Sequence, residues 1–68
     1  MTWQRHKGTN TLPPRWTSGR WTIYRTVSRT RVAWELWDTQ AKEWHRNYHT
    51  LFAAKQYAAR YDNATTAP

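Results

Sequence analysis

The chain has no cysteine, few acidic residues and no long apolar run. The absence of cysteine excludes disulfide bonds and the cysteine-rich zinc folds. No apolar stretch approaches the roughly 20 residues that a membrane-spanning helix needs. The N-terminal stretch MTWQRHKGTNTLPP is basic but has no hydrophobic segment, which argues against a secretory signal. We therefore expect a cytoplasmic protein that does not enter a membrane.

Aliphatic side chains are also scarce, with one Ile and three Leu against six Trp, four Tyr and one Phe among 68 residues. A chain this short buries only about 60% of the surface that it exposes when unfolded. The core must therefore use large aromatic side chains, and six indoles are too many to bury completely. Aromatic surface that stays exposed usually marks a binding site.

Acidic residues number four, against eleven Lys and Arg, which gives a formal charge of +7. Eight of the eleven cations are Arg. Because a guanidinium binds phosphate bidentately and stacks on flat bases, this bias suits a nucleic-acid partner. The alternative is that the charge only keeps a small protein soluble.

Residues 1–19 mix Thr, Gly, Pro and basic residues without any periodicity. We predict a flexible basic arm here, stiffened by Pro13 and Pro14 where it joins the domain. Trp3 and Trp16 are unusual in a linker. An arm that folds back, with one or both indoles packed on the domain, is the open alternative.

Residues 20–62 contain three alternating segments, RWTIYRTV, RVAWELWD and EWHRNYHT. This period of two, rich in aromatic and β-branched residues, predicts a three-stranded antiparallel meander. Arg25 and Arg46 fall on the core side of the alternation. Either they snorkel at the periphery of the sheet or a bulge shifts the register. The expected core face is Trp21, Ile23, Trp34, Leu36, Trp44 and Tyr48.

The segment YHTLFAAKQYAARY, residues 48–61, predicts a helix. Thr50 supplies an N-cap oxygen, and an alanine-rich stripe follows at helical spacing. The expected fold class is α+β, a βββα domain over residues 20–62 with the helix packed on one face of the sheet. Residues 63–68 are predicted to be a disordered tail. The stripe consists of Leu51, Ala54, Ala58 and Tyr61.

The other sheet face is predicted to be open. Basic groups with interleaved aromatic rings can hold phosphates while the rings pack on sugars or bases, and a small sheet can enter the major groove. Glu35 is expected to pair with Arg20 or Arg31, or else to accept from a cytosine amino group. Trp37 is either covered by Trp16 or exposed as an anchor. The expected face is Arg20, Thr22, Tyr24, Thr26, Arg31, Ala33, Glu35, Trp37, His45, Asn47 and His49.

Three strands followed by a helix that begins Y-x-T-L-x-x-A resemble two families of DNA-binding domain over residues 20–62. These are the arm-type domain of phage integrases and the plant ethylene-response-factor domain. Tyr48, Thr50 and the helix alanines occupy comparable places. The resemblance implies that the exposed sheet face reads the major groove, with roles falling on Arg20, Arg31 and Trp37. Separately, the short length and the composition rich in Arg, Ala, Thr and Trp would fit a small phage-encoded protein.

No catalytic or metal-binding pattern is present in the sequence. His45 and His49 lie on one expected strand, where four residues separate them by roughly 13 Å, too far for one tetrahedral zinc. The four carboxylates are scattered and no pair has a catalytic spacing. We expect neither an enzyme nor a cofactor or metal site.

The predicted function is a small non-enzymatic nucleic-acid-binding module that takes duplex DNA on its open sheet face and basic arm. The alternative is a phage-type protein-binding module that docks on an acidic host protein and modulates it, because Arg and Trp are also enriched at protein interfaces. The candidate nucleic-acid-binding residues are Arg20, Tyr24, Arg29, Arg31, Trp37 and His45 in the domain, and Arg5, Lys7 and Arg15 in the arm.

Overall fold

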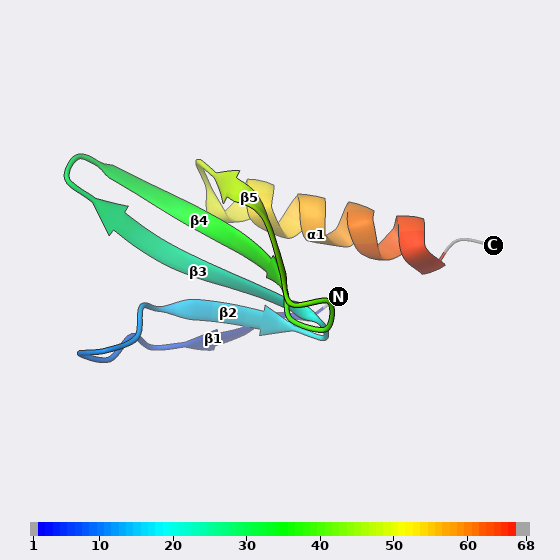
Figure 1. Ribbon diagram of the computed structural model, residues 1–68, viewed down its shortest axis with the longest axis horizontal. Coiled ribbons are helices and arrows are strands. Elements are labelled where there is room, and N and C mark those ends of the chain that lie inside the picture. The colour runs from blue at the N-terminus through cyan, green and yellow to red at the C-terminus, as the bar shows by residue number, and fades with distance from the viewer. Residues whose placement is uncertain (1, 67–68) are drawn as a thin grey trace.

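The computed structural model describes residues 2–66, which form one antiparallel sheet and one helix (Figure 1). The sheet has five strands in chain order, followed by the C-terminal helix. The predicted α+β class is confirmed, but the predicted count of three strands is wrong. The elements are β1 (Gln4–His6), β2 (Arg15–Ser18), β3 (Trp21–Ser28), β4 (Arg31–Asp38), β5 (Glu43–Tyr48) and α1 (Leu51–Thr66).

The two additional strands lie within residues 1–19, the segment predicted as an arm. β2 pairs with the first half of β3, and β1 pairs with β2. Gly8 lies in the loop that joins them, where an added Cβ would stand 2.8 Å from Cδ of Pro14. Trp3 and Trp16 pack against the core, so the alternative in which these indoles fold back is the one observed. Strand pairing, rather than local alternation, orders this segment.

The core lies between α1 and the sides of β3, β4 and β5 that face it. Ala54 and Ala58 are fully buried, so the helix backbone approaches the sheet closely. The predicted N-cap is present, because Oγ1 of Thr50 accepts a hydrogen bond from the backbone N–H of Ala53 at 3.1 Å. The buried hydrophobic residues are Trp21, Ile23, Leu36, Tyr48, Ala54 and Ala58.

The helix continues to Thr66 and so includes residues 63–66 of the predicted tail. Residues 67 and 68 of that tail, and residue 1 of the predicted arm, lie outside the described residues. No helix in the described part of the chain is long and apolar enough to cross a membrane.

A β-bulge interrupts the pairing of β5 with β4. Leu36 lies opposite Arg46 and Trp37 lies opposite Trp44, which leaves His45 as the extra residue. The bulge turns His45 toward the helix side, where its ring centroid lies 5.2 Å from that of Trp21. The predicted positions of His45 on the open face and of Trp44 in the core are therefore both wrong.

Of the two explanations offered for the arginines with core parity, placement at the periphery with snorkelling applies. The bulge does not change the parity of Arg46, which lies opposite the buried Leu36. Arg46 is exposed, and its guanidinium lies 5.6 Å from the ring centroid of Tyr48. Arg25 pairs with Trp34 near the end of the ladder that β4 forms with β5.

The β3–β4 hairpin is longer than the strands beside it. β2 pairs with β3 only over residues 21–24, and β5 pairs with β4 only over residues 34–38. Among the described residues, 26–33 therefore pair only with each other, and they form a two-stranded ribbon that projects from the sheet (Figure 1). We call residues 26–33 the ribbon. It contributes to an elongated shape of 43 × 20 × 20 Å.

Candidate nucleic-acid interface

Three of the four acidic side chains gather at the end of the sheet where β3 begins and β4 ends. Asp38 is the last residue of β4, and Glu43 is the first residue of β5. Asp62, near the C-terminus of α1, accepts a hydrogen bond from Nε1 of Trp21 at 3.3 Å. We call Asp38, Glu43 and Asp62 the acidic end, and all three carboxylates act electrostatically on Arg20. Glu35 is the one acidic residue of the sequence outside this group.

Arg20 belongs to the acidic end and not to the open face as predicted. It follows Gly19, whose φ of 57° forms the tight turn between β2 and β3. Its guanidinium donates a hydrogen bond to Oδ2 of the buried Asp38. This bond raises the pKa of Arg20 and lowers the pKa of Asp38, whose other oxygen accepts from the backbone N–H of Gln40 and Ala41. The charge of Arg20 is thus engaged within the protein.

The opposite end carries cations without carboxylates. Arg29 and Arg31 are exposed at the tip of the ribbon, and Arg25 lies at its base. No acidic residue occurs between Trp21 and Trp34. Strand alternation places Arg25 and Arg31 on opposite faces of the hairpin. We call Arg25, Arg29 and Arg31 the cationic end.

Two further features add positive potential here. The β1–β2 loop, which holds the exposed Lys7, lies at the same end of the molecule as the tip of the hairpin (Figure 1). α1 also begins on this side, and its first turn contains no acidic residue. The N-terminus of a helix carries a partial positive charge, which these surroundings leave uncompensated.

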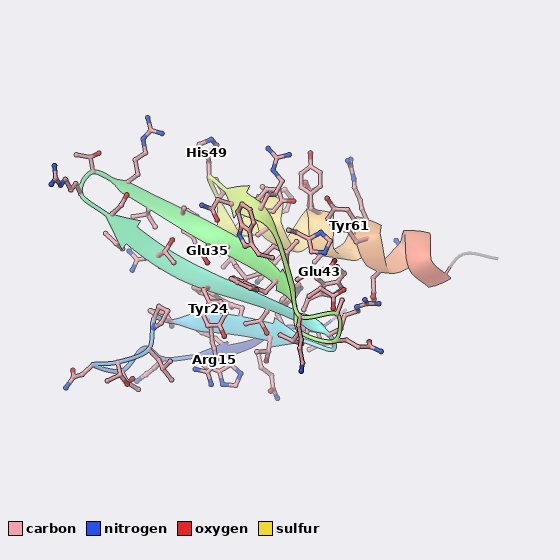
Figure 2. All side chains as sticks on the ribbon, in the orientation of Figure 1. Arg15, Tyr24, Glu35, Glu43, His49 and Tyr61 are labelled. Carbon is pink, nitrogen blue, oxygen red and sulfur yellow. The ribbon has the colours of Figure 1, made fainter. Side chains whose placement is uncertain are left out.

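The open sheet face is aromatic and nearly neutral. Neighbouring residues on four adjacent strands cross this face in the order Arg15, Tyr24, Glu35 and Asn47. Figure 2 shows the first three of them. Nε1 of Trp37 donates to Oε1 of Glu35 at 3.1 Å, and Nε1 of Trp44 donates to Oδ1 of Asn47 at 3.3 Å. Glu35 lies opposite Tyr24, and Arg20, one of its two expected partners, pairs with Asp38 instead. Within residues 2–66 no ion pair joins Glu35 to Arg31.

A shallow apolar groove of about 410 Å³ crosses this face. The β1–β2 loop forms one wall, and Trp37 forms part of the floor. Trp16 lies opposite Ile23 on the helix side, so it does not cover Trp37 as one interpretation required. Trp44, beside Trp37, is 51% exposed. The lining residues are Leu12, Pro13, Tyr24, Thr26, Glu35 and Trp37.

The structure distributes the predicted site residues over four places. The tip of the ribbon holds Arg29 and Arg31. The open face holds Arg15, Tyr24 and Trp37. Arg20 lies in the acidic end, where it pairs with Asp38. His45 packs against Tyr61 of the helix. Arg5 and Lys7 are exposed in β1 and just after it.

Sequence reasoning missed Trp44 as a surface residue, and it did not count Arg25 among the binding residues. The signal at Arg25 was its core parity, because a cation at such a position must leave the core by some route. Trp44 carried no comparable signal, since its exposure depends on the bulge at His45.

The resemblance to three-stranded DNA-binding domains was based on the strand–helix order and on the start of the helix. Thr50 and the two buried alanines do perform the structural roles expected of them. The two additional strands, β1 and β2, make this sheet wider than the three-stranded sheet that the resemblance implied. Comparisons with protein-family models, with curated proteins and with solved structures gave no match to this chain.

Proposed function

We propose that this chain is a non-enzymatic nucleic-acid-binding module whose partner is duplex DNA. The observation that supports the proposal is the separation of charge along the molecule. The cationic end has three arginines and no carboxylate, whereas Arg20 at the other end is already paired with Asp38. A polyanion would therefore be attracted more strongly to the cationic end than to the acidic end.

The chemistry of the cationic end fits phosphate. Guanidinium groups donate in a planar fork that matches two phosphate oxygens. Arg29 and Arg31 are exposed, so binding them requires little desolvation of other protein groups. Ser28 and Thr30 beside them supply further hydrogen-bond donors of the kind that contacts the DNA backbone.

The test is fluorescence anisotropy of a labelled duplex of mixed sequence, titrated with the protein at two salt concentrations. Each phosphate contact contributes about −0.9 to the slope of log affinity against log salt. Three contacts then predict an affinity that falls about 40-fold between 50 and 200 mM salt. No binding at 50 mM salt, or binding that salt leaves unchanged, would contradict the proposal.

The apolar groove favours a second candidate, a protein-binding module that docks on an acidic protein. Exposed Trp and Tyr beside a groove are typical of the anchors that contribute most energy at protein interfaces. In that case Trp37→Ala would weaken binding of the partner more than Arg31→Ala. For duplex DNA we expect the reverse order in the same anisotropy assay.

A further inference from the structure

We infer that the ribbon, and not the open sheet face, is the element that enters the major groove of B-form DNA. This inference rests on the proposed function and specifies the contact surface. It combines three observations on the hairpin: its width, its reach and the placement of its arginines.

The width of the sheet argues against docking by the whole face. Five strands at a spacing of about 4.8 Å span about 19 Å, whereas the major groove is about 12 Å wide. A two-stranded ribbon does fit that groove. Residues 26–33 are the part of the described chain in which the sheet narrows to two strands.

The reach of the ribbon matches the depth of the groove. From Arg25 to Ser28, three steps of about 3.4 Å give about 10 Å before the turn begins. The major groove is about 8.5 Å deep. Oγ1 of Thr26 donates to the carbonyl of Ala33 at 3.3 Å across the ribbon, which helps to hold its two strands together.

The side chains of the hairpin suit a groove entered tip first. Arg25 and Arg31 lie on opposite faces, so each would meet one of the two phosphate walls. Arg29 lies in the turn, where a guanidinium would reach the groove floor and bind guanine O6 and N7. Val27 lies opposite Val32 and is 66% exposed, which suits contact with a thymine methyl group. The ligand is thus a guanine-containing stretch of B-form duplex.

The first experiment compares two variants that lose the same charge. Arg29→Ala with Arg31→Ala removes two cations from the ribbon, and Arg46→Ala with Arg60→Ala removes two exposed cations elsewhere. We expect the ribbon variant to lose at least about 10-fold more affinity and to lower the salt slope by about 2. Circular dichroism verifies that both variants remain folded.

The second experiment tests the groove directly. A duplex with 7-deazaguanine in place of guanine loses the N7 acceptor in the major groove and keeps its phosphates. We expect the wild type to bind it at least about 5-fold more weakly, and Arg29→Ala to abolish that difference. An RNA duplex of the same sequence should also bind weakly, because the A-form major groove is too narrow for side chains.

The outcomes separate this inference from the function beneath it. If the wild type binds DNA but Trp37→Ala and Arg15→Ala weaken binding more than the ribbon variant, the inference is overturned and the function stands. Binding that is insensitive to 7-deazaguanine also overturns it. Failure of the wild type to bind any duplex overturns both.

Discussion

The two halves of the β3–β4 hairpin are built from the same two strands and do different things. The inner half, residues 21–24 and 35–38, has a strand on each side and α1 above it, and it holds Trp21, Ile23 and Leu36 in the core. The outer half is the ribbon, whose Val27 is largely exposed. Burial energy is therefore concentrated in the inner half, and the outer half is available for contact.

The largest difference should appear when one aliphatic residue is shortened in each half. Leu36 is fully buried, so Leu36→Ala should cost about 2–5 kcal/mol of unfolding free energy. Total stability for a chain of this length is only about 3–10 kcal/mol. Val27→Ala should cost less than about 0.5 kcal/mol. Urea denaturation, monitored by Trp fluorescence, measures the unfolding free energy of both variants. Equal losses would mean that the ribbon is packed like the inner half.

A smaller effect is expected at the acidic end of the inner half. Asp38→Ala removes the acceptor for Arg20, Gln40 and Ala41, which should cost on the order of 2 kcal/mol. Because the hydrogen bond from Arg20 lowers the pKa of Asp38, this stabilisation is present above about pH 4 and is lost as the pH falls through the lowered value. Thermal unfolding from pH 6 to pH 2 measures it. A variant as acid-sensitive as the wild type would contradict this role.

A further effect, of similar size, is expected at high pH. Burial raises the pKa of Tyr48 to about 12, assisted by the neighbouring Tyr61. The unfolded chain releases this proton near pH 10, so the folded state binds more protons between about pH 10 and 12 and stability falls across that range. Absorbance of tyrosinate and unfolding free energy against pH measure the effect. Tyr48→Phe should flatten part of the decline, and an unchanged slope would refute the assignment.

Alternation in the sequence was enough to predict β3 and β4, and the N-cap with the alanine-rich stripe was enough to predict the start of α1. In each case one face of the element is buried and the other is not, so the local pattern shows which side faces the core. β1 and β2 were not predictable in this way. They have three and four residues, and what orders them is pairing, such as Trp16 against Ile23. Local propensity carries little information about such non-local contacts.

The candidate site was predicted only in part, for related reasons. Arg29 lies in a connection and Arg31 directly follows it, so their exposure followed from the strand boundaries. Arg20 was misplaced because its partner, Asp38, is 18 residues away in the chain. His45 and Trp44 were exchanged between faces by a single extra residue, since a shift of one position reverses the side that each side chain faces.

The independence of the ribbon from the core has a consequence for how such a chain evolves. Arg29 and Thr30 are exposed, so substitutions at the tip should change the folding equilibrium little. Under the proposed mode of binding, such a domain could change its target by substitutions at the tip, without losing the few kcal/mol of stability that Ile23 and Leu36 help to supply. Folding and recognition would then depend on different residues of one hairpin.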